Sequence, residues 1–307
     1  MKSIVIINPK SGGGKTKNLE SALKSALSGV RPGIHRTLYP GHAAGIARKA
    51  VKQKADMIIA VGGDGTINEI INVIAGKDII LGIIPSGTAN DLATLYNLPS
   101  EINKASEIIL SRNIREIDLI SVNGRYYATA GGVGLPCDVA DIANAIRRHG
   151  GFTRALCKIL GSKLYIFAVI TALFVRARHN NSLNIRYGNC SLVVNPLSIM
   201  VANQPFLGKN IKMSPGAAND DGVFDICLIN NCLSRLKILH LLARILKGTH
   251  IFLPSVTTIK ADNITIKSEK PISFFGDGEV FHQNTEFNIK LAPKALKLIV
   301  PPQKARI

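Results

Sequence analysis

The sequence predicts an α/β domain followed by an antiparallel, β-rich domain, and three observations support this fold class. The 307 residues exceed the length of one typical domain. Patterns typical of strands and helices alternate up to about residue 120, as in a parallel sheet. Beyond Ile117, short alternating runs such as YYATA, SLVVN, FDICLI and FNIKL are typical of antiparallel strands.

The elements of the first domain follow in order from its apolar runs. Strands are expected where short apolar runs are bounded by turn residues, and helices where apolar residues recur every three or four positions. The expected strands are Ser3–Ile7, Met57–Val61 and Ile79–Ile84, and the expected helices are Lys17–Leu27, Ala43–Lys54, Thr66–Ile74 and one beginning near Asn90.

The net charge predicts anionic partners. The chain has 38 Lys and Arg against 20 Asp and Glu, a formal net charge of +18. Such an excess favours nucleic acid, an anionic membrane surface or phosphorylated metabolites. Aromatic residues make up 5% of the chain and Trp is absent. Platforms for base stacking are therefore poorly supplied, and a nucleic-acid partner is not expected.

The cysteines and the apolar runs bear on location. The five cysteines form no C-x-x-C pair, which favours reduced thiols in a cytoplasmic protein over a disulfide framework or a zinc site. The N-terminus enters a strand-like run without the zones of a signal peptide. The longest apolar run, Leu164 to Val175, is too short to cross a bilayer, so no transmembrane segment is expected.

One segment is strongly basic. From Ile142 to Asn219, 78 residues include ten Lys or Arg and no Asp or Glu. Apolar residues recur at helical spacing between Phe152 and Leu164. Two interpretations stay open, a basic amphipathic helix lying on anionic lipid and a helix packed on the core with a solvated basic face. The first would attach the protein peripherally to a membrane.

The run MIIAVGGDGTINEIIN, Met57 to Asn72, gives the strongest signal of a site. A strand runs into a turn with three glycines, which lets backbone N–H groups approach an anion at a helix N-terminus. Asp64 would repel a bare phosphate, so it indicates Mg²⁺ or its waters between the two groups. The alternative is a turn in which Asp64 or Thr66 only caps the helix.

A second turn has a similar form. In IIPSGTANDLA, a strand is followed by Gly87, Thr88, Asn90 and Asp91 before a helix. These side chains could hold a nucleotide, or they could cap the helix. Because neighbouring parallel strands end at the same edge of a sheet, we expect both turns at the carboxyl edge, where α/β ligand sites form.

Two later runs place carboxylates at turns. In FFGDGEVFHQ, Glu279 follows the hairpin dipeptide Asp277-Gly278 and could take a proton from a hydroxyl nucleophile. In SPGAANDDGVFDICLI, Asp220 and Asp221 could hold a hard cation. From spacing alone, an ordinary turn is the default for both runs.

The opening run INPKSGGGKT is not a Walker loop, although it ends in Gly-Lys-Thr. Pro9 stands where the first Walker glycine belongs. Proline has a fixed φ and no N–H to donate, so it cannot replace that glycine.

Together, INPKSGGGK, GGDGTINE, PSGTANDLA, DDGVFD, GDGE and the closing PKALKLIVP resemble the diacylglycerol kinase catalytic domain family, in particular its bacterial lipid-kinase branch related to sphingosine kinases. The resemblance implies a nucleotide-binding α/β domain like that of NAD kinase and phosphofructokinase, and a β-rich lipid-binding domain. It implies a C-terminal strand that returns to the first domain, giving domains of 1–122 with 293–307 and 123–292. The implied activity is ATP- and Mg²⁺-dependent transfer of the γ-phosphate to the hydroxyl of diacylglycerol or a related lipid.

The resemblance also implies roles for single residues. Glu279 would be the general base, with Asp64 and Asp277 as further catalytic residues and Asp64 organising Mg²⁺. A structural magnesium site would use Asp221 and the carbonyls of Ala218 and Val223. The residues that would contact ATP are Asn8, Pro9, Lys10, Ser11, Gly12, Thr37, Gly62, Gly63, Asp64, Gly65, Thr66, Ile67, Asn68 and Thr88.

Two other functions stay open. A protein like NAD kinase shares the GGDGT turn, but it predicts neither the late Asp277-Gly278-Glu279 nor the acid-free segment. A non-catalytic basic protein that binds membrane or nucleic acid is opposed by the carboxylates of Asp64, Asp221 and Glu279, because negative charge weakens binding to anionic polymers.

Overall fold

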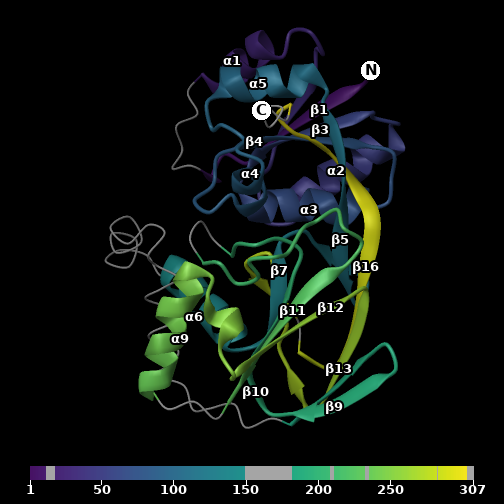
Figure 1. The fold of residues 1–307 in the computed structure, drawn as a ribbon. Coiled ribbons are helices and arrows are strands. Elements are labelled where there is room, and N and C mark those ends of the chain that lie inside the picture. The colour runs from purple at the N-terminus through teal and green to yellow at the C-terminus, as the bar shows by residue number, and fades with distance from the viewer. Residues whose placement is uncertain (12–17, 149–181, 208–210, 232–234, 282, 303–307) are drawn as a thin grey trace. The chain divides into compact units, whose positions relative to one another are not determined.

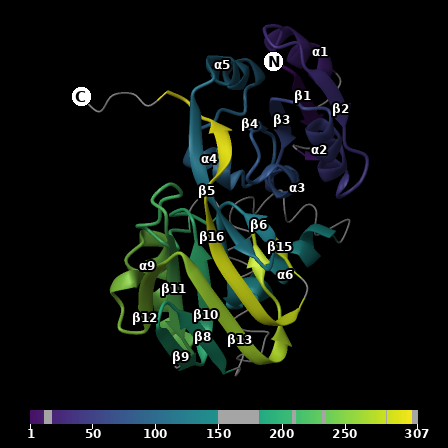
Figure 2. The ribbon, with the colours of Figure 1, turned by 90° about the vertical axis from the view of Figure 1, so that its right-hand side faces the viewer.

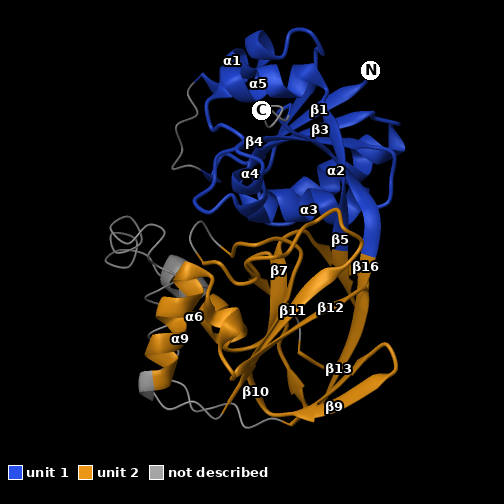
Figure 3. Ribbon diagram, viewed as in Figure 1, with its two compact units in different colours: residues 1–119, 292–307 blue, residues 120–291 orange. Residues whose placement is uncertain are grey.

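The computed structural model describes residues 1–11, 18–148, 182–207, 211–231, 235–281 and 283–302. They form two compact units, 1–119 with 292–307 and 120–291, shown in blue and orange in Figure 3. Two strands, β5 (Ile114–Val122) and β16 (Asn284–Ile299), carry the chain from one unit to the other, and β16 is the long yellow strand in Figure 2. The helix expected between Phe152 and Leu164 lies outside the described residues.

Unit 1 is a parallel sheet covered by helices (Figure 1). Its strand order is β2-β1-β3-β4-β16, and each neighbouring pair is parallel. The strands besides β16 are β1 (Ser3–Ile7), β2 (Gly33–Arg36), β3 (Met57–Gly62) and β4 (Ile80–Pro85). The helices are α1 (Leu19–Ala26), α2 (His42–Lys52), α3 (Asp64–Ile74), α4 (Asp91–Leu95) and α5 (Ile102–Ser111).

Both faces of this sheet are covered, which explains why its strands read as unbroken apolar runs. On one face, Val5 and Ile7 of β1 pack with Leu23 of α1 and Ile109 of α5. On the other, α2 contacts β1 and α3 contacts β3. The strand β2 was not predicted from the sequence, because its residues GIHR are mostly exposed and form no apolar run.

Unit 2 is mainly antiparallel, and the predicted fold class, α/β followed by β-rich, is confirmed. One sheet has the order β12-β11-β10-β7-β14-β15, and a second joins β9, β8, β13, the first part of β16 and the β5–β6 hairpin. Their bounds are β6 (Arg125–Tyr127), β7 (Ala130–Gly134), β8 (Leu183–Tyr187), β9 (Cys190–Val194), β10 (Pro196–Ala202), β11 (Phe224–Asn230), β12 (Val256–Ala261), β13 (Asn263–Ile272), β14 (Phe275–Gly276) and β15 (Glu279–Val280).

Two hydrophobic clusters hold unit 2 together. Between the two sheets, the ring of Phe274 lies 5.3 Å from that of Phe287, 5.7 Å from that of Phe281 and 6.0 Å from that of Tyr127. The second cluster joins the six-stranded sheet to the helices α6 (Leu135–Arg148) and α9 (Arg235–Lys247). No helix in the described part of the chain is long and apolar enough to cross a membrane.

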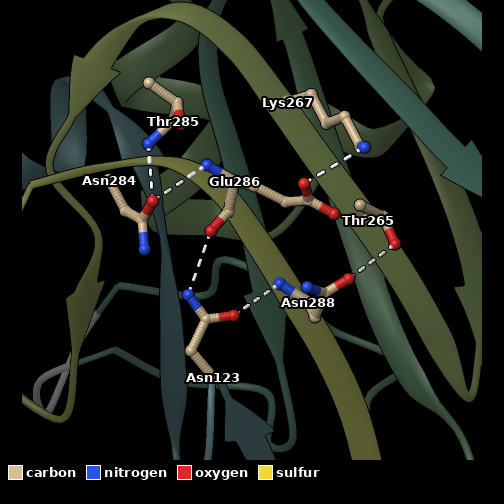
Figure 4. Close-up of polar contacts among 7 residues, drawn as sticks. All are labelled: Asn123, Thr265, Lys267, Asn284, Thr285, Glu286 and Asn288. Atoms are coloured by element: carbon tan, nitrogen blue, oxygen red, sulfur yellow. Dashed lines mark hydrogen bonds and ion pairs between the residues drawn. The ribbon is translucent and has the colours of Figure 1, made fainter.

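The β5–β6 hairpin is tied to β16 by its turn. Asn123 and Gly124 both have positive φ, 50° and 85°, as a tight two-residue hairpin requires. The Asn123 amide donates to the carbonyl of Glu286 at 3.0 Å, and its oxygen accepts from the N–H of Asn288 at 2.8 Å (Figure 4). This contact fixes the position of Arg125, which directly follows the turn.

Candidate active site

Three turns meet at the carboxyl edge of the sheet in unit 1. They follow β1, β3 and β4, which are adjacent and parallel, as the sequence predicts for the last two. The Asn8 amide of the first turn donates to the hydroxyl of Thr66 in the second at 2.9 Å. The hydroxyls of Ser11 and Ser86 join the first turn to the third at 2.6 Å.

Asp64 links the two glycine-rich turns. Its carboxylate accepts from the backbone N–H of Asn90 at 2.8 Å and from that of Asp91 at 2.7 Å. It therefore caps the N-terminus of α4 rather than that of its own helix, a contact that no local pattern in the sequence predicts. The glycines allow this approach, since a Cβ on Gly87 would lie 2.5 Å from the Cα of Gly63.

A hollow of about 170 Å³ lies beside these turns. It brings together five residues that the resemblance assigns to ATP, namely Asn8, Lys10, Thr37, Gly65 and Thr66. Tyr39 also lines it, and its exposed ring stacks on that of His42 at 4.6 Å. The hollow thus combines hydroxyls, one cation and an aromatic ring, a set that fits a nucleotide. The carboxylate of Glu69 also lines it, and it accepts from the N–H groups of Gly41 at 2.8 Å and Ala43 at 3.0 Å.

Other assigned residues lie elsewhere. The side chains of Ile67 and Asn68 are each 3% exposed within α3, so they can reach a nucleotide only through the backbone. Thr88 is exposed in the turn after β4 and does not line the hollow. Gly12 lies outside the described residues. Pro9, Ser11, Gly62 and Gly63 form the backbone of the first two turns.

The carboxylate of Asp277 supports the hairpin that carries Glu279. Asp277 has a φ of 49° and accepts from the N–H of Ala128 at 3.0 Å, the N–H of Thr129 at 2.9 Å and the hydroxyl of Thr129 at 2.6 Å. Through these three hydrogen bonds, the Asp277 carboxylate holds the hairpin turn against Ala128 and Thr129. Asp277 therefore helps to set the position of Glu279, two residues further along the same hairpin.

Glu279 forms an ion pair with Arg125, a residue that the sequence did not indicate. The Arg125 guanidinium also lies over the ring of Phe281, 4.2 Å from its centroid. Arg125 and Glu279 are 154 positions apart, so only the fold could bring them together. With its side chain 46% exposed, Glu279 is both oriented and accessible.

The turn assigned to structural magnesium already contains a cation. Lys260 Nζ lies 3.0 Å from Asp221 Oδ2 and 3.5 Å from Asp225 Oδ2. The hydrogen bond to Asp221 raises the pKa of Lys260, and burial raises the pKa of Asp225 against the opposing effect of Lys260. Among the described residues, no three His, Cys, Asp or Glu side chains are grouped to hold a metal. The Lys260 ammonium therefore compensates the charge of Asp221 without a metal, and the magnesium site with the carbonyls of Ala218 and Val223 stays a prediction.

We therefore expect the thermal unfolding midpoint of the protein to be the same in Mg²⁺ and in EDTA. Lys260→Met should lower the free energy of unfolding by about 1 kcal/mol, because two carboxylates lose their cation, and added Mg²⁺ should restore part of it. Calorimetry measures both. Lys267→Met, which breaks the exposed pair with Glu286 at 3.1 Å, is the control and should not respond to Mg²⁺. A wild-type midpoint that falls in EDTA would instead support the magnesium site at Asp221.

An apolar cavity of about 90 Å³ lies in unit 2 among α6, α9 and the six-stranded sheet. Ser198 supplies the one hydroxyl of its described lining, and its buried oxygen has no hydrogen-bond partner there. The remaining lining residues are Leu135, Pro136, Val139, Ala140, Leu197, Leu207, Ile211, Met213, Ile229, Ile238, Leu241, Leu242, Ile245, Leu246 and Phe275. Such a lining suits a hydrocarbon chain rather than a polar metabolite.

Two family models match the two parts of the chain. The diacylglycerol kinase catalytic domain matches residues 2–122. The YegS C-terminal NAD kinase beta sandwich-like domain matches residues 138–300, which by itself is more than half of the chain. The chain belongs to the diacylglycerol kinase catalytic domain family. The predicted family is thereby confirmed, and with it the expectation of an enzyme of the lipid kinase class.

Relatives in this family span nearly the whole chain. The chain is 28% identical to a diacylglycerol kinase of Bacillus subtilis over 281 residues, covering 90% of this chain and 88% of that one. It is 29% identical to a diacylglycerol kinase of Mycobacterium tuberculosis, covering 98% and 95%. A solved structure of a proposed diacylglycerol kinase from Bacillus anthracis has a TM-score of 0.78 at 24% identity, covering 98% of this chain and 95% of that one, and it supports the fold.

Proposed function

We propose that this chain is an ATP- and Mg²⁺-dependent lipid kinase that transfers the γ-phosphate of ATP to the hydroxyl of diacylglycerol or a related lipid. The apolar cavity of unit 2 carries the proposal, because a lipid kinase needs a place for hydrocarbon and a kinase for soluble metabolites does not. The relatives named diacylglycerol kinase support the same substrate class.

ATP would occupy the hollow of unit 1. Lys10 offers a positive charge to its phosphates, and the turns after β1 and β3 offer backbone N–H groups. When bound, Mg²⁺ supplies charge neutralisation on the transferred phosphoryl group. Asp64 keeps the turn after β3 joined to α4 through its two backbone hydrogen bonds, so a rigid turn meets the nucleotide.

Glu279 would accept the proton of the lipid hydroxyl as that oxygen bonds to the γ-phosphorus and the bond to the ADP oxygen breaks. Arg125 holds its carboxylate in one orientation through their ion pair. Diacylglycerol would place its acyl chains in the apolar cavity, and Ser198 Oγ could donate to an ester carbonyl there. The protein would work in the cytoplasm, attached peripherally to a membrane surface.

The test is transfer of labelled γ-phosphate from Mg²⁺–ATP to a panel of acceptors in mixed micelles. The panel contains diacylglycerol, monoacylglycerol, phosphatidylglycerol, a sphingoid base and, as the soluble acceptor, NAD. We expect label in diacylglycerol or a close relative. Label in NAD alone would contradict the proposal in favour of an NAD kinase, and binding to vesicles with no transfer to any acceptor would favour a non-catalytic membrane protein.

A further inference from the structure

The helix α9 has two faces with different roles. Ile238, Leu241 and Ile245 are buried and face the six-stranded sheet. Leu239 and Leu246 lie seven residues apart, two helical turns, and are therefore on one side of the helix. They are 45% and 40% exposed, so α9 presents an apolar strip away from the core.

Basic residues lie elsewhere around α9, Lys247 at about 90° from the strip and Arg244 and Lys237 at about 150–170° from it. Lys237 and Lys247 are exposed, and Arg244 is half-buried. The sequence contains no Asp or Glu between Asp225 and Asp262, so no acidic residue of this stretch offsets their charge. With Lys247 on the side nearest the strip and no acidic residue in the stretch, α9 combines the apolar and basic groups of a helix that lies at the surface of an anionic bilayer.

The short 3₁₀ helix His250–Phe252 follows α9 and contacts it. His250 is fully buried, and its ring nitrogen Nε2 lies 3.0 Å from the carbonyl oxygen of Met213, which anchors this turn. Phe252, two residues on, is 77% exposed, the highest value among the large hydrophobic side chains of the described residues. The anchored turn therefore exposes the Phe252 ring to solvent, and transfer of this ring to the interfacial layer of a membrane would be favourable.

The apolar cavity reaches the surface at this strip. Leu246 lines the cavity and is also partly exposed, and Leu242, one turn before it, lines the cavity as well. A lipid in a bilayer touching the strip would therefore meet the cavity without crossing water. This continuity favours a lipid surface over a protein as the partner of α9.

We propose that the exposed face of α9 together with Phe252 docks the protein on an anionic lipid bilayer. Leu239, Leu246 and Phe252 enter the interfacial layer, while Lys237, Arg244 and Lys247 attract the headgroups. In sequence, this surface is separate from the acid-free segment from Ile142 to Asn219. Vesicle binding is measured without ATP, so failure of this proposal and failure of the proposed kinase activity are distinguishable.

Co-sedimentation with sucrose-loaded vesicles tests the proposal. The full-length protein is mixed with vesicles of phosphatidylcholine alone or with 30% phosphatidylglycerol, about three in ten lipids being anionic. We expect binding only to the anionic vesicles and its loss as salt is raised. The pair Lys237→Glu and Lys247→Glu should weaken binding at least about tenfold, and Phe252→Ser should weaken it several-fold.

Matched controls change the same chemistry elsewhere. Lys49→Glu with Lys52→Glu alters two exposed lysines of α2 by the same total charge, and Val193→Ser alters a side chain that is 73% exposed. Both should leave binding within twofold of the wild type. Equal binding of wild type to neutral and anionic vesicles, or equal loss in the α9 and α2 variants, would overturn the proposal. The side chain of Phe252 is largely exposed, so Phe252→Ser should fold normally. Its vesicle binding therefore tests the proposal even if the double lysine variant fails to fold.

Discussion

Glu279→Gln is expected to lower kcat for lipid phosphorylation by about 10² to 10⁴-fold, because the amide cannot accept the proton of the acceptor hydroxyl. The substitution keeps the size of the side chain and a hydrogen-bond acceptor for Arg125. Glu279 would act on the acceptor hydroxyl and does not line the hollow assigned to ATP, so the KM for ATP should stay the same. Steady-state kinetics with varied ATP and saturating lipid measure the two parameters separately.

Glu286→Gln is the matched control for this experiment. Glu286 forms an ion pair with Lys267, as Figure 4 shows, and its side chain is 41% exposed against 46% for Glu279. Both variants therefore break one exposed ion pair of unit 2 and should lose similar, small amounts of stability. Only the Glu279 variant should lose turnover. Equal kcat in the two variants would remove Glu279 as the base and leave the fold and the family as they are.

The sheet of unit 1 and its ligand-binding edge could be predicted because local signals carry them. Unbroken apolar runs marked β1, β3 and β4, and glycines after β3 and β4 marked turns that the parallel arrangement brings to one edge. The edge strand β2 left no such signal, since its residues are exposed. The helices α6 and α9 were also absent from the β-rich prediction, although both bury an apolar stripe.

The contacts that shape the candidate site could not be predicted from the sequence, because they join residues that are far apart along the chain. Asp64 could be recognised as unusual among glycines, but its hydrogen bonds run to Asn90 and Asp91. Arg125 and Glu279 form an ion pair although they are 154 positions apart. The pairing of Lys260 with Asp221 likewise follows from the strand register of β11 and β12. Spacing within one motif contains none of this information.

Ala140→Phe is expected to lower kcat/KM for a long-chain lipid such as dioleoylglycerol by about thirtyfold. Ala140 is 3% exposed and lines the apolar cavity from α6, so a phenyl ring there takes the space of an acyl chain. Excluding two or three methylene groups costs about 2 kcal/mol of burial, which corresponds to that factor in kcat/KM. The measurement is kcat/KM for diacylglycerols of increasing chain length in mixed micelles.

The chain-length series separates a blocked cavity from general damage to the enzyme. Dihexanoylglycerol does not need the depth of the cavity, so its kcat/KM in Ala140→Phe should stay within about twofold of wild type. Val193→Phe, which adds the same ring at an exposed position of β9, should change neither substrate. Overpacking a full core lowers the free energy of unfolding by about 1–3 kcal/mol. Because the new ring fills empty space, Ala140→Phe should not show this loss of stability. If long and short lipids lose activity together, the cavity does not hold the acyl chain, and the selectivity for lipid must arise at the hydroxyl end of the substrate.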